Sequence, residues 1–159
     1  MLVVTACGST ADGSTTTSTA TSTDAPAEAV VPRQLEDLDL ATLQVGDREM
    51  LVSVADTPAA RSTGLMFITE LDDLDGMVFV YQADTTTLFH MLNTLIPLDI
   101  AFFGADGLLV SKTSMVPCET DTCPKYPSEG PYRYAIEAPA GAFDWVDSST
   151  VLDVEPLTS

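Results

Sequence analysis

A run of polar side chains between two apolar stretches is the part of the sequence where binding or catalysis is easiest to place. His90, Asn93, Thr94 and Asp99 follow one another closely, with apolar residues before and after them. A buried polar group that lacks a hydrogen-bond partner costs about 1–3 kcal/mol, so each of these groups needs a partner. The cluster therefore either ties neighbouring backbone segments together or lines a ligand pocket.

Two arginines extend this candidate pocket. If the protein has a ligand site, we expect it at the polar cluster, with Arg61 or Arg133 as contacts for an anionic group. Arginine suits that role because its guanidinium carries a permanent charge and several donors. The ligand itself, a small molecule or another envelope protein, is not identified by these residues.

His90 is the only histidine of the chain and therefore the only imidazole that could act as a base. With a carboxylate it could serve a hydrolase. With Met66, Met77, Met91 and Met115 it could offer soft ligands to Cu(I). Methionines beside Leu, Phe and Val are more often core residues. No glycine-rich phosphate loop, dinucleotide fingerprint or haem motif is present, so we expect no cofactor.

Cys118 and Cys123 stand in a stretch rich in turn-forming residues. Outside the cytoplasm such a pair favours a disulfide. A zinc site is the alternative, but zinc normally takes four ligands from Cys, His or carboxylate.

The charge of the chain is strongly unbalanced. It has 24 acidic residues against six lysines and arginines, a formal net charge of −18. Such a surface repels phosphate backbones and anionic lipid headgroups, so we expect no nucleic-acid partner. The charge favours solubility or salty surroundings, or else docking of a cationic partner.

The chain opens with an apolar run that ends in small residues and a cysteine, Met1–Cys7. This run resembles the lipobox of bacterial lipoproteins, where the cysteine sulfur receives a diacylglyceryl group. An export signal needs a basic start and an apolar stretch of about 7–15 residues, which do not fit before Cys7. We therefore expect that the true start codon lies upstream and that residues 1–7 are the end of a signal peptide. We also expect Cys7 to carry a lipid that anchors the protein to the membrane. The alternative is a cytosolic protein with an apolar start.

Residues 8–32 consist largely of Ser, Thr, Ala, Asp and Gly and contain no aromatic residue. Such a segment cannot offset its ordering entropy, so we expect a disordered linker. The remainder, 33–159, has the size of one domain. These features place that domain outside the cytoplasm, tethered to the cell membrane.

Short alternating and apolar segments dominate residues 33–159. A helix of about two turns is expected at 57–64, where Thr57 can cap, Pro58 can begin and Gly64 can end it. A helical turn is expected at 140–146 and a hairpin turn at 105–107. The expected strands are 51–56, 76–81, 85–90, 98–103, 108–116, 132–137 and 151–155. This pattern predicts a small α+β, antiparallel, β-rich domain with a barrel-like curl.

Several separated motifs resemble the family called domain of unknown function 192. They are Ala55-Asp-Thr-Pro with Arg61 and Gly64-Leu-Met-Phe67, Gly76-Met-Val-Phe79, Phe89-His-Met-Leu-Asn-Thr94 with Ile96-Pro-Leu-Asp-Ile100, Val116-Pro-Cys118, Cys123-Pro, Tyr126, and Tyr134-Ala-Ile-Glu137 with Ala140-Gly141. The resemblance covers about 45–155 and implies a small α+β domain, often exported, with no established activity. Members usually carry Trp and Lys where this chain has His90 and Leu92.

Together these features predict a non-catalytic binding or accessory module of the cell envelope, with its pocket near His90, Asn93 and Asp99. Two alternatives stay open: an envelope hydrolase that uses a carboxylate with His90, and a copper-handling protein that uses His90 and methionines.

Overall fold

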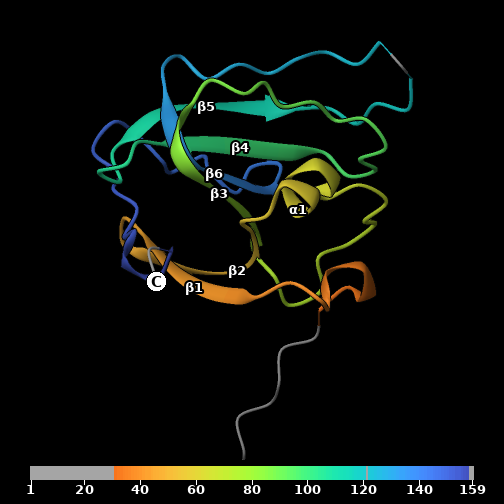
Figure 1. The fold of residues 1–159 in the computed structure, drawn as a ribbon, viewed down its shortest axis with the longest axis horizontal. Helices are drawn as coiled ribbons and strands as arrows, with labels where there is room; N and C mark the ends of the chain where they lie inside the picture. Colours follow the sequence, from red (N-terminus) through yellow and green to blue (C-terminus); the bar gives the residue numbers. More distant parts are fainter. Residues whose placement is uncertain (1–30, 121, 158–159) are drawn as a thin grey trace, which may run out of the picture.

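The computed structural model describes residues 31–120 and 122–157, and one sheet dominates them (Figure 1). Its strand order is β1-β2-β3-β6-β4-β5. The strands are β1 (Leu40–Val45), β2 (Arg48–Ala55), β3 (Gly76–Thr85), β4 (Leu98–Phe103), β5 (Leu109–Met115) and β6 (Tyr132–Pro139). One short α-helix, α1 (Pro58–Thr63), and two 3-10 turns, η1 (Arg33–Leu35) and η2 (Glu155–Leu157), accompany it.

The sheet is mixed rather than purely antiparallel. Strands β2 and β3 run parallel, and the other neighbouring strands run antiparallel. A parallel pair needs a crossover connection, and here the crossover contains α1 and the long segment that follows it. The prediction of a small β-rich domain is confirmed, and the prediction that its sheet is antiparallel is corrected at this one pair.

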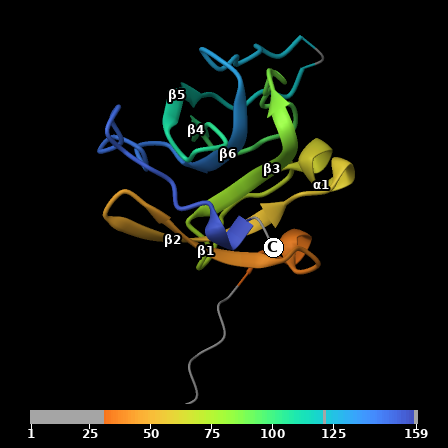
Figure 2. The same ribbon diagram turned by 60° about the vertical axis from the view of Figure 1, so that its left-hand side comes forward.

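The sheet is strongly curled but open. Strands β4 and β5 lie on one side and β1 and β2 on the other, with β3 and β6 between them (Figures 1 and 2). Residues 151 and 152 partly connect the two edges of the sheet. Leu152 pairs with Val45 of β1, and Val151 pairs with Leu108, just before β5, each as an isolated bridge. Single bridges do not close a sheet, so the barrel-like form is not confirmed.

The capping residues of α1 behave as predicted. The Thr57 side chain accepts a hydrogen bond from the backbone N–H of Ala60 at 3.1 Å, and Pro58 opens the helix. Gly64 ends it with a φ of 51°, a conformation that a residue without Cβ adopts readily. The sequence therefore determines where this helix begins and ends.

Two of the expected strands are wrong. β3 continues to Thr85, and the chain then leaves the sheet, so 85–90 contributes only the single bridge between Phe89 and Tyr126. The threonine-rich start of this segment has strand propensity, but contacts with other segments determine its conformation in the fold. Residues 151–155 form bridges and the start of η2, and 140–146 form turns instead of a helical turn. β1 was not expected and is a full strand at the sheet edge.

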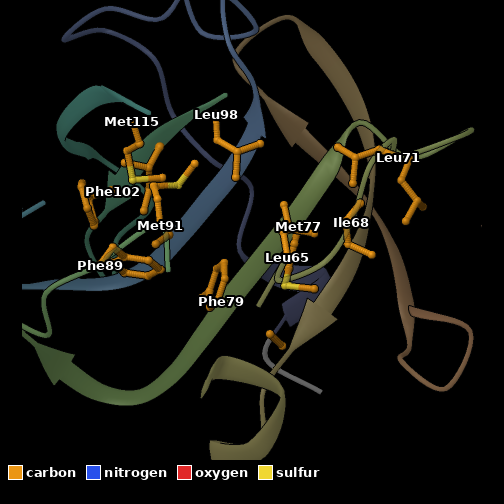
Figure 3. Packing of buried hydrophobic residues seen from close by; sticks show 14 of the residues in the cluster. Leu65, Ile68, Leu71, Met77, Phe79, Phe89, Met91, Leu98, Phe102 and Met115 are labelled. Carbon is orange, nitrogen blue, oxygen red and sulfur yellow. The ribbon is translucent and has the colours of Figure 1, made fainter. Parts of the chain in front are cut away.

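Each face of the sheet has its own apolar core. One core, which we call the aromatic core, packs Phe79, Phe89, Phe102 and Tyr132 against one another and against buried methionines (Figure 3). The other core lies on the opposite face. Strand β4 is buried along its whole length, which fits its largely apolar sequence, in which Asp99 is the exception.

Strand β6 passes very close to Gly76 at the start of β3. A Cβ placed on Gly76 would lie 2.1 Å from the backbone oxygen of Glu137. Gly76→Ala should therefore force the strands apart and lower the free energy of unfolding by about 1–3 kcal/mol in urea titrations. Gly130→Ala is the control, since its Cβ would meet Val110 at an ordinary 3.5 Å. Equal stability of the two variants would contradict this packing.

Candidate functional site

A cavity of about 180 Å³ opens beside α1 and the aromatic core. Its polar lining includes Arg61 from α1, Thr87, His90 and Thr94 from the segment between β3 and β4, and Glu137 from β6. Apolar side chains such as Leu65, Phe79 and Phe89 complete the wall, and Figure 3 shows Phe79 between the other two. Residues distant in the sequence thus converge on one hollow.

Glu137 is the most unusual member of this site. In the register of the sheet it stands between Met77 on β3 and Ile100 on β4, and both neighbours are fully buried. Only 5% of Glu137 is exposed. Burial away from water raises the pKa of its carboxyl group to about 8, so the group is mostly protonated at neutral pH.

Arg61 is fixed in place without a carboxylate partner. Its Nη1 donates hydrogen bonds to the backbone oxygens of Asp56 and of Val80, the latter at 2.9 Å. The guanidinium lies over the ring of Tyr81, 4.9 Å from the ring centroid. Among the described residues no acidic side chain forms an ion pair with Arg61, although the chain is rich in acid.

His90 lies on a segment held by other parts of the fold. Phe89 exchanges two backbone hydrogen bonds with Tyr126, at 3.1 and 2.9 Å. The Tyr132 hydroxyl donates to the Thr87 backbone oxygen at 2.8 Å. Burial, with a smaller contribution from the charge of Lys125, lowers the pKa of His90. The imidazole is therefore mostly neutral at neutral pH.

These two shifts determine the charge of the cavity. A protonated Glu137 and a neutral His90 contribute none, whereas Arg61 contributes one positive charge. The charged side chain that lines this hollow is therefore positive, in a protein of net charge −18. Such a site attracts anions that the rest of the surface repels.

Asn93 lies beside the cavity but has a backbone role. It adopts a left-handed φ of 56°, and its N–H donates to the Cys118 carbonyl at 2.8 Å. Its own carbonyl accepts from the N–H of Phe67, also left-handed with a φ of 63°, at 2.8 Å. Asn93 is not part of the cavity lining. It connects three chain segments instead.

Asp99 and Arg133 lie away from this cavity. Asp99 is buried, and its Oδ2 accepts from the N–H of Gly141 at 2.7 Å, beside a different hollow. Arg133 forms an ion pair with Asp84 at 2.8 Å. Of the six residues predicted for the pocket, the structure therefore brings Arg61, His90 and Thr94 together. Whether they hold a ligand stays a prediction.

Cys118 and Cys123 form a disulfide, as predicted. Both thiols are used in this bond, so they are not available to zinc. The bond lies in the loop that supports the cavity, because Cys118 pairs with Leu92 and with Thr94 as isolated bridges. The predicted lipid attachment at Cys7, the signal peptide 1–7 and most of the linker 8–32 lie outside the described residues.

Fold and cavity together define a small β-rich domain built on one curled mixed sheet, with a small hollow between its helix and the aromatic core. The chain belongs to the family domain of unknown function 192 (DUF192, uncharacterized ACR), whose model matches residues 41–150. The resemblance seen in the sequence motifs is thereby confirmed. A comparison with curated proteins finds no match.

Two solved structures share the fold. A protein of unknown function from Novosphingobium aromaticivorans DSM 12444 superposes with a TM-score of 0.69 at 27% identity, covering 80% of this chain and 94% of that one. A putative transcription regulator from Sinorhizobium meliloti 1021 superposes with a TM-score of 0.65 at 23% identity, covering 73% of this chain and 94% of that one. At 23% identity, the similarity to this second protein shows a shared fold and nothing about function.

Sequence reasoning missed Glu137 as a site residue. The signal was present, because an acidic residue interrupts the apolar run Ala135-Ile136-Glu137-Ala138 in a strand. A carboxyl group that alternation places on a buried face either finds a partner or shifts its pKa. With 24 acidic residues in the chain, this one did not stand out by type.

The buried carboxyl group predicts a pH dependence of stability. Its pKa is raised from 4.5 in the unfolded chain to about 8 in the fold, so the folded state binds the extra proton. The stability contributed by this proton is complete below pH 4.5 and is lost as the pH rises towards about 8. Relative to the native chain, Glu137→Gln should gain stability across this window, by up to about 1.4 kcal/mol per pH unit.

Urea unfolding of the native chain and of Glu137→Gln at a series of pH values measures this difference. Glu129→Gln, which removes one acidic side chain from the exposed surface, is the control. A difference between native chain and Glu137→Gln that does not change with pH would show that Glu137 is ionised in the fold.

Proposed function

We propose that this chain is a binding module of the cell envelope, held outside the cytoplasm by a lipid on Cys7, and that its cavity takes up a small molecule without transforming it. The observation that carries this proposal is the arrangement of Arg61, His90 and Thr94 around the buried Glu137. A few convergent polar groups in a partly apolar hollow are typical of small-molecule sites. A perturbed carboxyl group adds to this indication.

The extracytoplasmic location is supported by two features of the chain. Disulfides persist in oxidising compartments and are rare in the cytosol, and Cys118 and Cys123 are bonded. The lipobox-like run Met1–Cys7 and the hydroxyl-rich segment behind it supply an anchor and a tether. In the described part of the chain, no helix has the length and apolar character to cross a membrane.

A hydrolase fits the cavity less well than a binding protein. Glycoside hydrolysis commonly takes two carboxyl groups, and Glu137 is the only acidic residue among the described residues that line the cavity. Nucleophilic catalysis needs a hydroxyl or thiol bonded to a base. The Nδ1 of His90 instead accepts from the backbone N–H of Leu92 at 3.3 Å, and no described hydroxyl group is bonded to the ring.

Copper handling is also less well supported. Met66 lines the cavity together with His90, but Met77, Met91 and Met115 are buried in the aromatic core. These three methionines fill apolar space, as buried methionines usually do. Binding of an organic small molecule is therefore the function that the described residues support best.

A fragment screen tests the binding function. Isotope-labelled full-length protein should show fragments that shift the amide signals of Gly64, His90 and Thr94. Ser62→Trp, on the exposed helix at the cavity, should abolish these shifts by filling the hollow. The control is Ser114→Trp, an exposed serine beside the other hollow, which should leave them unchanged. Fragment shifts confined to other regions, or no binding fragment at all, would refute the proposal.

The lipid anchor has a separate test. In its native cell, the mature protein should be found in the membrane fraction, with mass spectrometry detecting a diacylglyceryl group on Cys7. Cys7→Ala should leave the protein unacylated and shift it out of that fraction. Recovery of the native chain from the cytosol, unacylated and with free thiols at 118 and 123, would overturn both the anchor and the location.

A further inference from the structure

We infer that the ligand of this cavity is a small carboxylate with a short apolar body, bound through the guanidinium of Arg61. This inference rests on the proposed function, because it names the class of molecule that the binding site takes. Three features of the described residues carry it: the unpaired charge of Arg61, the fixed position of its guanidinium, and the composition of the surrounding wall.

Arg61 is an unneutralised cation in an acidic protein. The chain has 24 acidic residues, yet none of those described pairs with Arg61. Arg133 shows the contrasting case, because its Nε and Nη2 both donate to Asp84, at 3.0 and 2.8 Å. A partly buried arginine is stabilised most by an anionic partner. At Arg61 no described side chain takes this position, so an anionic ligand can take it.

The guanidinium of Arg61 is also preorganised. Its Nη1 donates to the backbone oxygens of Asp56 and Val80, and its Cζ lies over the ring of Tyr81. The Nε and Nη2 donors have no partner among the described residues. These two donors form the edge that binds both oxygens of a carboxylate, and a fixed edge loses little entropy when it does so.

The wall of the cavity specifies the rest of the ligand. Leu65, Phe79, Leu88 and Phe89 offer apolar contacts, so an aliphatic or aromatic body fits beside the charged group. The volume of about 180 Å³ lies below the roughly 300–1,000 Å³ of pockets for drug-sized ligands, so that body is short. One positive charge matches a monoanion better than a phosphate, which carries close to two negative charges.

Glu137 makes the binding dependent on pH. The titratable groups that share the cavity with it are Arg61 from α1, Tyr81 from β3 and His90 from the following segment. In its protonated form Glu137 adds an O–H donor and no charge. Ionisation above its pKa of about 8 adds a negative charge to the cavity that holds the carboxylate of the ligand, which weakens binding.

A matched pair of probes tests the inference. Butyrate and butyramide have nearly the same shape and differ in charge. At pH 7 butyrate should shift the amide signals around the cavity of the full-length protein at about millimolar concentration, whereas butyramide should bind at least about tenfold more weakly. Arg61→Lys keeps the charge but loses the two-donor edge and should weaken butyrate binding about tenfold. Arg133→Lys is the matched control and should leave it unchanged.

The pH profile provides a second readout that does not depend on an arginine variant. Butyrate affinity should fall as the pH rises above about 8 in the native chain, and this fall should be absent in Glu137→Gln. Equal affinity for butyrate and butyramide, tighter binding of inorganic phosphate than of butyrate, or full affinity in Arg61→Lys would each overturn the carboxylate inference. Those results leave the binding function standing, because uncharged fragments in the same cavity test it separately.

Discussion

The rest of the site depends on one constraint, a carboxyl group buried within a sheet whose two faces are both covered by apolar side chains. Glu137 is only 5% exposed and lies between fully buried neighbours on β3 and β4, where an ionised group would lose most of its hydration. It therefore keeps its proton to a pH of about 8 and adds no charge to the cavity. The guanidinium of Arg61 is then the charged group among the described residues that line the cavity, in a protein that is otherwise strongly acidic.

The fold positions this site through connections between segments that are distant in sequence. The parallel pair β2 and β3 requires a crossover, and the crossover places α1 with Arg61 at the edge of the cavity. On the other side, Phe89 and Tyr126 exchange backbone hydrogen bonds, and the disulfide loop at Cys118 pairs with the residues around Asn93. These contacts hold His90 and its neighbours against the aromatic core without a regular strand.

Sequence patterns predicted the elements whose signals are local. Thr57, Pro58 and Gly64 defined α1, and the strand expected at 98–103 matched β4. The failures came from tertiary contacts: 85–90 has strand propensity but leaves the sheet, and the parallel pair has no local signature.

Tertiary structure also separates the residues of the polar cluster that the sequence placed in one pocket. Proximity in sequence grouped Asp99 with His90, whereas the twist and register of the sheet place Asp99 beside another hollow. Only the assembled sheet shows that the lone acid of β6 faces the cavity.

The central claim is that Glu137 is an uncharged carboxylic acid in the native fold. Titrating the carboxyl carbon signal of Glu137 by NMR in the folded protein reports its protonation state directly, without passing through unfolding or ligand binding. We expect a midpoint near pH 8, with the acid form present throughout the neutral range. A midpoint near 4.5, the ordinary value for glutamate, would show that the side chain is ionised, and the positive field assigned to the cavity would be wrong.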